Sequence, residues 1–343
     1  MKIVSVTTVR NEGPYLLEWI AWHRLIGVTD FLFYSNDCDD GTDHLLDALA
    51  DEGIVRHAAN TLTEGKSVQW SGLQAAWKDD LRKSADWMIF SDVDEFPMIH
   101  AGQHRLGDLF DAVGQDFDAM TLPWRLFGFN GQIDLVDAPV TQQFTRCAPP
   151  SLFNPIAATF FKSIFRPGAF SRPGIHRPRR GNKDMPRWVN GSGRPLAPHV
   201  AHNDKRLSLV GVEQERALVD LHHYSLRSAQ AFVLKSERGL PNRKDKQIDL
   251  SYWVTRNFNQ VENHAAQAMS ASLRKEMNAL LALPKVADLH AISFDWHRKR
   301  FRQLIKNTYH YELYTQILLS ENSACFPEKL ARDLLLMFSQ LEK

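Results

Sequence analysis

Residues 87–96 read "WMIFSDVDEF", an apolar run followed at once by Asp92, Asp94 and Glu95. A short apolar run that ends at polar residues is typical of a buried strand. Because side chains alternate along an extended backbone, Asp92 and Asp94 are predicted to point to the same side. Three carboxylates this close repel one another unless a positive charge lies between them. The stretch therefore predicts a strand end that holds a cation.

The chain before this stretch alternates between strand and helix patterns. Runs of β-branched and aromatic residues predict strands at residues 2–9, 31–35, 54–57 and 87–90. Three helices are predicted between these strands. The first is capped by Asn11, has Pro14 in its first turn and ends at Gly27. The second runs from the polar loop at 35–42 to Gly53, and the third covers residues 66–83. This order predicts an α/β fold with a Rossmann-like, mostly parallel central sheet flanked by helices and joined by right-handed crossovers.

Polar segments follow three of the predicted strands. They read "VRNEG" at 9–13, "SNDCDDGT" at 35–42 and "SDVDEF" at 91–96. Ligands of open parallel sheets bind beyond the carboxyl ends of the strands, near the point where strand order reverses. The agreement of the three segments predicts a binding site at that edge.

The rest of the chain is less regular. A helix is predicted at Leu106–Val113, a strand at 118–127, an irregular Pro-, Gly- and Arg-rich region at 145–205, and a strand running into a helix at 219–228. A mainly helical C-terminal extension follows. The predicted organisation is a first unit at 1–135, a second unit at 136–230 and the helical extension at 231–343.

Composition excludes several classes of protein. The 343 residues are 44% hydrophobic and 24% charged, with a net charge of +1, so no global field favours nucleic acid. Three scattered cysteines without a CxxC spacing argue against a disulfide framework and a thiolate zinc site. No apolar run approaches the roughly 18 residues of a membrane span, and no secretory signal is recognised. We expect a cytoplasmic protein, with peripheral membrane contact left open.

The chemistry of the acidic stretch points to a divalent metal. Two hard oxygen ligands on one side of the chain suit Mg²⁺ or Mn²⁺, which takes one or two carboxylates together with water and substrate phosphates. A solvated acidic turn is the alternative for an isolated DxD. Its position after a buried strand of this sheet favours the metal.

Three segments resemble a known family. "VTTVRNEGPYLLEWIAWHRLIGV" (6–28), "FYSNDCDDGT" (33–42) and "FSDVDEF" (90–96) are similar to the N-terminal half of a glycosyltransferase family 2-like enzyme with the GT-A fold, in a bacterial branch with an SDVDEF-type DxD motif. The resemblance covers residues 1–130 well and extends more loosely to about residue 240.

The resemblance implies a hexosyltransferase-like activity. Such enzymes move a sugar from a nucleotide-diphosphate donor to an acceptor, here a glycan, a polysaccharide or a lipid-linked sugar, and inversion is the expected stereochemistry. A bound Mn²⁺ or Mg²⁺ would neutralise the charge that develops on the departing diphosphate. A homodimer stays open as an alternative to a monomer.

The resemblance also implies roles for individual residues. Donor-binding residues are Thr8, Arg10, Asn11, Glu12, Asn36, Asp37, Lys66, Asp92 and Lys162; metal ligands are Asp92, Asp94 and His223, with His222 as the alternative histidine; acceptor residues are Trp124 and Arg125; catalytic residues are Asp94, Glu95 and His176. Glu95 is expected to orient metal-bound water, to contact the acceptor or to support the metal ligands without contacting substrate. The resemblance also makes residues 1–135 the nucleotide-sugar-binding half and residues 136–230 the acceptor-side half.

Two features qualify this assignment. A basic loop containing Lys162, Arg166, Arg172, His176, Arg177, Arg179, Arg180, Lys183 and Arg187 is predicted either to clamp phosphates or to be a solvated surface loop. The "ED" pair that supplies the base in many inverting family 2 enzymes is not found in residues 120–240. The base is therefore unassigned among His176, His199, His202 and Asp204.

Three alternative functions were weighed. A phosphatase with a strand-end DxD would place that motif after its first strand and not its fourth. A sugar nucleotidyltransferase needs a Gly-rich loop after the first strand, which "TTVRNEGPY" lacks. An inactive carbohydrate- or nucleotide-binding module would tolerate loss of the DxD, which this chain retains.

Overall fold

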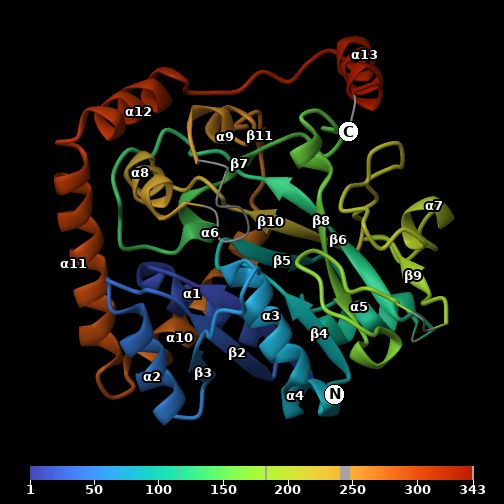
Figure 1. The fold of residues 1–343 in the computed structure, drawn as a ribbon, viewed down its shortest axis with the longest axis horizontal. Helices are drawn as coiled ribbons and strands as arrows, with labels where there is room; N and C mark the ends of the chain where they lie inside the picture. The colour runs from blue at the N-terminus through green and yellow to red at the C-terminus, as the bar shows by residue number, and fades with distance from the viewer. Residues whose placement is uncertain (115, 182–183, 240–247, 342–343) are drawn as a thin grey trace.

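The computed structural model describes residues 1–114, 116–181, 184–239 and 248–341. Its centre is a nine-stranded sheet, counted over this described part, in the order β3-β2-β1-β4-β8-β6-β10-β5, with β9 paired to β6 (Figure 1). The strands are β1 Ile3–Val9, β2 Asp30–Ser35, β3 Arg56–Ala59, β4 Trp87–Phe90, β5 Glu95–Ile99, β6 Ala119–Leu126, β8 Phe161–Phe165, β9 Trp188–Val189 and β10 Val219–His223; β7 Arg146–Cys147 and β11 Val261–Glu262 form a separate pair.

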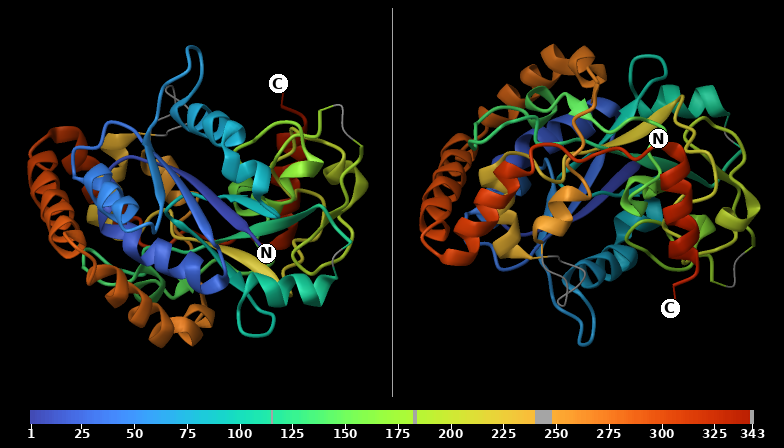
Figure 2. Two further views of the ribbon diagram at one scale, coloured as in Figure 1. Left: turned by 90° about the horizontal axis from the view of Figure 1, so that it is seen from below. Right: turned by 90° about the horizontal axis from the view of Figure 1, so that it is seen from above.

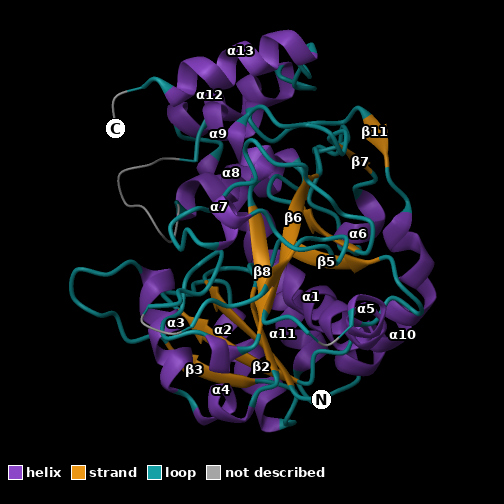
Figure 3. Cartoon of the chain, turned by 90° about the vertical axis from the view of Figure 1, so that its right-hand side faces the viewer, coloured by secondary structure: helices purple, strands orange, loops and turns teal. Residues whose placement is uncertain are grey.

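Helices surround this sheet. They are α1 Gly13–Ile26, α2 Thr42–Asp51, α3 Val68–Lys78, α4 Asp80–Ser84, α5 Leu106–Val113, α6 Val140–Gln143, α7 Pro198–Ala201, α8 Ala229–Arg238, α9 Leu250–Val254, α10 Ser270–Leu281, α11 Val286–Leu304, α12 Thr308–Leu319 and α13 Glu328–Ser339. Figures 2 and 3 show them on both faces of the twisted sheet. The predicted α/β class, with a mostly parallel central sheet and a helical C-terminal extension, is confirmed.

The sheet mixes two pairing directions. Strands β3, β2, β1 and β4 run parallel to one another, whereas β8 is antiparallel to both of its neighbours, β4 and β6. Strand β10 then pairs in parallel with β6 and antiparallel with β5. Strand order therefore reverses next to β4, which places the acidic stretch at the topological switch of the sheet.

The period of two in β1 separates two cores. Ile3 and Val9 belong to the core under α1, α2, α5 and α10, whereas Val4 and Val6 belong to the core under α3 and α4. Because both faces of β1 are covered, six of its seven residues are buried, including Ser5 and Thr7. A third core joins α8, α9 and α12.

Several predicted boundaries differ from the observed ones. The third strand begins at Arg56, two residues late, and the helix expected over 66–83 breaks at Asp79, whose side chain caps α4. Gly27 ends α1 in the left-handed region as predicted, but Asn11 does not cap that helix. The backbone of Asn11 has a φ of 52°, and the Asn11 side chain accepts a hydrogen bond from the Asp39 amide at 2.8 Å.

Two five-residue strands of the sheet, β5 and β8, were missed, as were the two-residue strands β7, β9 and β11. The acidic stretch does not end at a loop, because its Glu95 begins β5. The region expected to be irregular contains β8, a fully buried strand in the middle of the sheet. Its letters, "FKSIF", carry a lysine at the centre, which an apolar-run criterion rejects.

The C-terminal extension packs on the N-terminal half. Helix α11 contacts α1, α2 and α8 and stands along one side of the molecule in Figure 1, whereas α13 lies apart at the end of a long connection. Large apolar side chains of α13 are exposed, including Leu336 and Met337. No helix within the described ranges is both long enough and apolar enough to cross a membrane.

A buried carboxylate ties α11 to the sheet edge. Asp40, whose side chain is completely buried, accepts from the amides of Gly13 at 3.1 Å and Thr42 at 2.9 Å. It also accepts from the Ser293 hydroxyl and pairs with His297 Nε2, both at 2.9 Å. One carboxylate thus joins the starts of α1 and α2 to α11, so the C-terminal extension forms part of this edge.

Substituting Gly13 tests this junction. A Cβ at Gly13 would lie 2.0 Å from Ser293 Oγ, so Gly13→Ala must displace α11 and should lower the free energy of unfolding by about 1–3 kcal/mol. Gly107→Ala in α5 is the matched control, because its Cβ would meet open space. Urea unfolding of both variants measures the difference, and equal stabilities would contradict the packing described.

Candidate active site

The acidic stretch forms a turn fastened from several directions. The Glu95 amide donates to the Asp92 carbonyl at 3.0 Å, and the Asp92 amide donates to Glu95 Oε2 at 2.9 Å. From α1, Trp19 Nε1 donates to the carbonyls of both residues, at 3.0 and 3.1 Å. From the end of β10, the Tyr224 amide donates to the Asp94 carbonyl at 2.8 Å. The turn is therefore fixed before any ligand binds.

A buried lysine forms ion pairs with Asp92 and Glu95 of the turn. Lys162 Nζ, from β8, lies 3.0 Å from Asp92 Oδ2 and 3.3 Å from Glu95 Oε2. The other oxygen of Asp92 accepts from Gln69 of α3 at 2.9 Å. The two carboxylates outweigh the effect of burial and raise the pKa of Lys162 above its usual range, so the lysine stays charged.

Glu95 has a structural position. Its side chain is completely buried, and burial, with Asp92 and Asp94 nearby, raises its pKa to about 8 against the attraction of Lys162. The predicted contact of Glu95 with water or acceptor does not fit this position, because the carboxylate lies under the turn and holds the Asp92 amide. We correct that assignment.

A second lysine forms an ion pair with Asp94. Lys235 Nζ, from α8, lies 2.7 Å from Asp94 Oδ2, and His223 Nε2 lies 3.5 Å from Oδ1. Burial opposes ionisation of Asp94, but Lys235 and His223 outweigh it and hold its pKa well below the usual range. The neighbouring His222 is directed to Asp220 instead, at 3.4 Å. Of the two adjacent histidines, only His223 therefore faces the acidic turn.

The two aspartates do not face a common partner. The predicted same-side geometry is wrong, because Val93 and Asp94 form a turn and not an extended segment. Asp92 is directed to β8 and α3, and Asp94 to β10 and α8. Accordingly, the part of the chain that the structure describes contains no group of three His, Cys, Asp or Glu side chains placed to hold one metal ion.

The residues present nevertheless fit a metal held by fewer protein ligands. Asp94 Oδ1 and His223 Nε2 form an adjacent oxygen–nitrogen pair, the kind of donor set that suits Mn²⁺. Ions of this type commonly take one or two protein ligands and complete their shell with water and substrate phosphates. Asp92 would then lie beside the ion's site and not in its first shell.

Aromatic rings line the space next to Asp94. The ring of Trp124, from β6, lies 4.1 Å from that of His223 and 5.4 Å from that of His176, measured between centroids. The His176 Nδ1 donates to the Phe161 carbonyl at 3.0 Å, which leaves Nε2 as the ring's acceptor. Burial, together with Lys162, lowers the pKa of His176 to about 4, so the ring is neutral at ordinary pH.

The other residues predicted for the acceptor and the basic loop lie elsewhere. Arg125 points to the opposite face of β6, where its Nε contacts Cys147 Sγ at 3.2 Å, so its predicted acceptor role does not fit. The loop arginines bind their own surroundings: Arg177 donates to the Val200 and Ala201 carbonyls and stacks on Trp188. Lys183 lies outside the described residues. A phosphate clamp by the whole loop is therefore not supported.

The remaining base candidates are peripheral. His199 and His202 are exposed, and Asp204 accepts from the Arg180 amide at 2.9 Å. Of the four candidates, His176 is the one beside Trp124.

The predicted nucleoside residues divide into two groups. Thr8 and Asn36 lie on the α3 side: Gly72 of α3 approaches Thr8 closely, and Asn36 Oδ1 accepts from Asn60 at 2.8 Å. Asp37 is exposed, and its carbonyl accepts from Arg10 Nε at 3.2 Å. Lys66 is exposed on the loop before α3, so its donor role stays a prediction.

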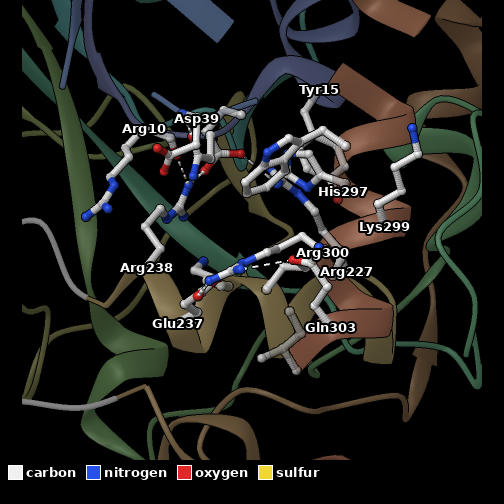
Figure 4. A pocket seen from close by; sticks show the side chains of 17 residues that line it. Arg10, Tyr15, Asp39, Arg227, Glu237, Arg238, His297, Lys299, Arg300 and Gln303 are labelled. Carbon is white, nitrogen blue, oxygen red and sulfur yellow. Dashed lines mark hydrogen bonds and ion pairs between the residues drawn. The ribbon is translucent and has the colours of Figure 1, made fainter. Parts of the chain in front are cut away.

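The second group lines a cavity on the α1 side. Arg10, Asn11 and Glu12 border a space of about 620 Å³ between the start of α1, helix α8 and helix α11 (Figure 4). Glu12 is buried and pairs with Arg227, at 2.8 Å, and with Arg238. These arginines outweigh burial and lower the pKa of Glu12. Glu12 is thus already neutralised and is poorly placed to bind a nucleoside.

Sequence reasoning undervalued the residues of α8 and α11. Lys235 and Arg238 are three residues apart, the spacing that places two side chains on one helical face, and both reach the predicted site. Their spacing alone does not distinguish them from solvated lysines and arginines. No feature of the sequence identified Gln69 of α3, whose side chain donates a hydrogen bond to Asp92.

Removing Lys162 tests the charge balance of the turn. Lys162→Met should lower the free energy of unfolding by about 3–5 kcal/mol, because it leaves Asp92 and Glu95 without their buried cation. Lys83→Met is the control: its pair with Asp80 has the same chemistry but is exposed, and its loss should leave the free energy of unfolding close to that of the wild type. Equal effects of the two substitutions in urea unfolding would contradict the structure.

Comparison with known proteins supports a single family. The sequence model of glycosyltransferase family 92 matches residues 3–213 of this chain. A family 92 protein of Oryza sativa subsp. japonica is 28% identical over 203 residues, 57% of this chain and 32% of the relative. A family 92 protein of Ricinus communis is 30% identical over 115 residues, 31% of this chain and 18% of the relative. The chain thus spans about a third or less of the length of these relatives.

Solved structures give weak likenesses. Residues 1–349 of TarS from S. aureus match with a TM-score of 0.37 and 15% identity, covering 88% of this chain and 92% of that one. Glucosyl-3-phosphoglycerate synthase from Mycobacterium tuberculosis matches with a TM-score of 0.25 and 17% identity, covering 36% and 44%. Scores this low carry no argument about the site.

The family match covers most of the sheet and both the Asp92 and the Lys162 segments. The motifs suggested a family 2-like glycosyltransferase, and the glycosyltransferase class holds, although the matching family is a different one. The chain belongs to glycosyltransferase family 92.

Proposed function

We propose that the protein transfers a sugar from a nucleotide-diphosphate donor, with a divalent metal, to a hydroxyl of a glycan, polysaccharide or lipid-linked acceptor. One observation carries the proposal: Asp94 and His223 form a buried oxygen–nitrogen pair beside Trp124, at the switch point of the sheet. Family membership supports the reaction class.

The donor is assigned to the α3 side of this site. Thr8, Asn36 and Asp92 face α3 there, at the carboxyl ends of β1, β2 and β4. Asp92 is partly exposed, with Gln69 fixing one oxygen, and so presents a preorganised acceptor to a ribose hydroxyl. Lys162, from β8, pairs with the other oxygen of Asp92 and balances its charge.

The residues that would hold a metal are Asp94 and His223. A divalent ion bound there would neutralise the negative charge that develops on the departing diphosphate. Lys235 stabilises the ionised form of Asp94 and adds positive charge on the same side. Trp124 packs against the rings of His176 and His223 and would border the sugar.

His176 is the candidate base. Its Nδ1 is committed to the Phe161 carbonyl, so its Nε2 lone pair can accept the proton of an acceptor hydroxyl. Its low pKa keeps that lone pair available throughout the neutral range. Direct attack by a hydroxyl so activated would invert the anomeric centre.

Substituting Asp94 tests the metal proposal. Asp94 is buried, so the isosteric Asp94→Asn is the suitable substitution. Mn²⁺-dependent hydrolysis of UDP- or GDP-sugars should fall about 100-fold or more in this variant. The exposed Asp111→Asn on α5 is the control and should match the wild type.

The same assay separates this function from its alternative. An inactive nucleotide- or carbohydrate-binding module would bind UDP or GDP without turnover and without response to EDTA. Wild-type hydrolysis that survives exhaustive chelation would exclude the metal role assigned to Asp94 and His223.

The pH profile tests His176. A base must be unprotonated, so activity is lost as pH falls through its pKa, and the acid limb of kcat should lie near pH 4 and not near 6.5. His176→Asn should lower kcat about 100-fold while leaving the KM for the donor within about twofold. An unchanged kcat would remove His176 from the mechanism.

A further inference from the structure

The cavity on the α1 side carries an excess of positive charge. Six of its described lining residues are Arg or Lys and three are Asp or Glu. The basic ones are Arg10, Arg227, Lys235, Arg238, Lys299 and Arg300. They come from the loop after β1, the segment before α8, and helices α8 and α11, so the fold gathers them from distant parts of the sequence (Figure 4).

The protein does not neutralise this charge by itself. Glu12 is one carboxylate shared by two guanidinium groups, those of Arg227 and Arg238. The side chain of Arg227 is 10% exposed, and its Nε and Nη2 have no hydrogen-bond partner in the part of the chain that the structure describes. Unpaired charged donors in so enclosed a place are costly, so an anion in the cavity would stabilise them.

One arginine at the cavity is more accessible than Arg227. Arg300 of α11 donates to both carboxylate oxygens of Glu237 of α8, once at 3.0 Å, and to Gln303 Oε1 at 3.0 Å, yet its side chain is 37% exposed (Figure 4). An entering anion can replace Glu237 as the partner of this planar donor. Arg302, two residues along α11, does not line the cavity.

The cavity lies on the far side of the reaction centre from the donor. Lys235 joins the two, because it lines the cavity while its Nζ pairs with Asp94. The contacts continue from Asp94 through His223 to Trp124 and His176. Thr8, Asn36 and Asp92 face α3, which covers the opposite face of the sheet from α1 and α11. A second ligand entering from the cavity therefore approaches the reaction centre from the side opposite to these proposed donor residues.

We propose that this cavity binds a phosphate-type oxyanion carried by the acceptor, with Arg300 as a direct contact. The assignment to the acceptor rests on the proposed function, whereas the oxyanion site itself does not. A phosphorylated sugar or a lipid-linked phosphosugar has the required chemistry: a charged group for the cavity and a hydroxyl beyond it.

Inorganic phosphate is the probe, titrated calorimetrically into the full chain without metal or nucleotide. Arg300→Gln should weaken phosphate binding about tenfold, the loss expected for one charged hydrogen bond. Glu237→Gln should act in the opposite direction and tighten binding, because it frees Arg300. Arg302→Gln is the matched control on the same helix and should bind phosphate as the wild type does.

A parallel titration with UDP or GDP and Mn²⁺ identifies the source of the anion. Nucleotide affinity that stays within about twofold in Arg300→Gln supports an acceptor site. A tenfold loss of nucleotide affinity in the same variant would place the donor's own diphosphate in the cavity and overturn the acceptor assignment. Absence of phosphate binding, or equal binding by all four proteins, would overturn the oxyanion site.

These outcomes are separable from the fate of the proposed function. If phosphate binds as expected but no nucleotide binds, the oxyanion site stands and the transferase proposal fails. If nucleotide binds and turns over while phosphate does not bind, the transferase proposal stands and this inference fails.

Discussion

The structure depends on how three carboxylates within four residues are neutralised at the end of a buried strand. Two lysines do this, one from each side of the turn: Lys162 between Asp92 and Glu95, and Lys235 on Asp94. Each lysine requires its own element, because Lys162 is carried by β8, inserted antiparallel beside β4, and Lys235 by α8. The sheet order and the position of α8 are thus coupled to the charge of a single turn.

This arrangement gives the two aspartates different tasks. Asp92 faces α3 with a lysine below it, and Asp94 faces a histidine and an aromatic ring on the other side. A DxD motif read from the sequence suggests two equivalent metal ligands. The fold instead directs Asp92 to α3 and β8 and Asp94 to β10 and α8, and the protein's own cations balance both.

The period-two and helical patterns predicted the first four strands and the position of the site, because local sequence decides those features. The family resemblance singled out Trp124, Lys162, His176 and His223 in addition to Asp92 and Asp94, and the fold brings these six residues together. Strand β8 was missed because its central lysine becomes understandable only when Asp92 and Glu95 are placed opposite it. Arg125 and Glu95 were misassigned because strand direction and burial, which follow from tertiary pairing, decide where those side chains point.

The C-terminal extension supplies one wall of the cavity on the α1 side, a role that the sequence did not indicate. Asp40 fastens α11 to the starts of α1 and α2, and helices α8 and α11 then form a cationic wall around Arg10 and Glu12. Nothing in the spacing of His297 or Arg300 identified them, because their partners lie more than fifty residues away in sequence. A site assembled from both ends of the chain becomes visible only in three dimensions.

The most direct test is a crystal structure of the full chain grown with Mn²⁺ and the nucleotide diphosphate that binds it, with anomalous scattering recorded at the manganese edge. The account predicts an anomalous peak in contact with the Asp94 carboxylate and the His223 imidazole, with the nucleoside on the α3 side near Asp92. A peak elsewhere, or a nucleoside lying between α8 and α11, would contradict it.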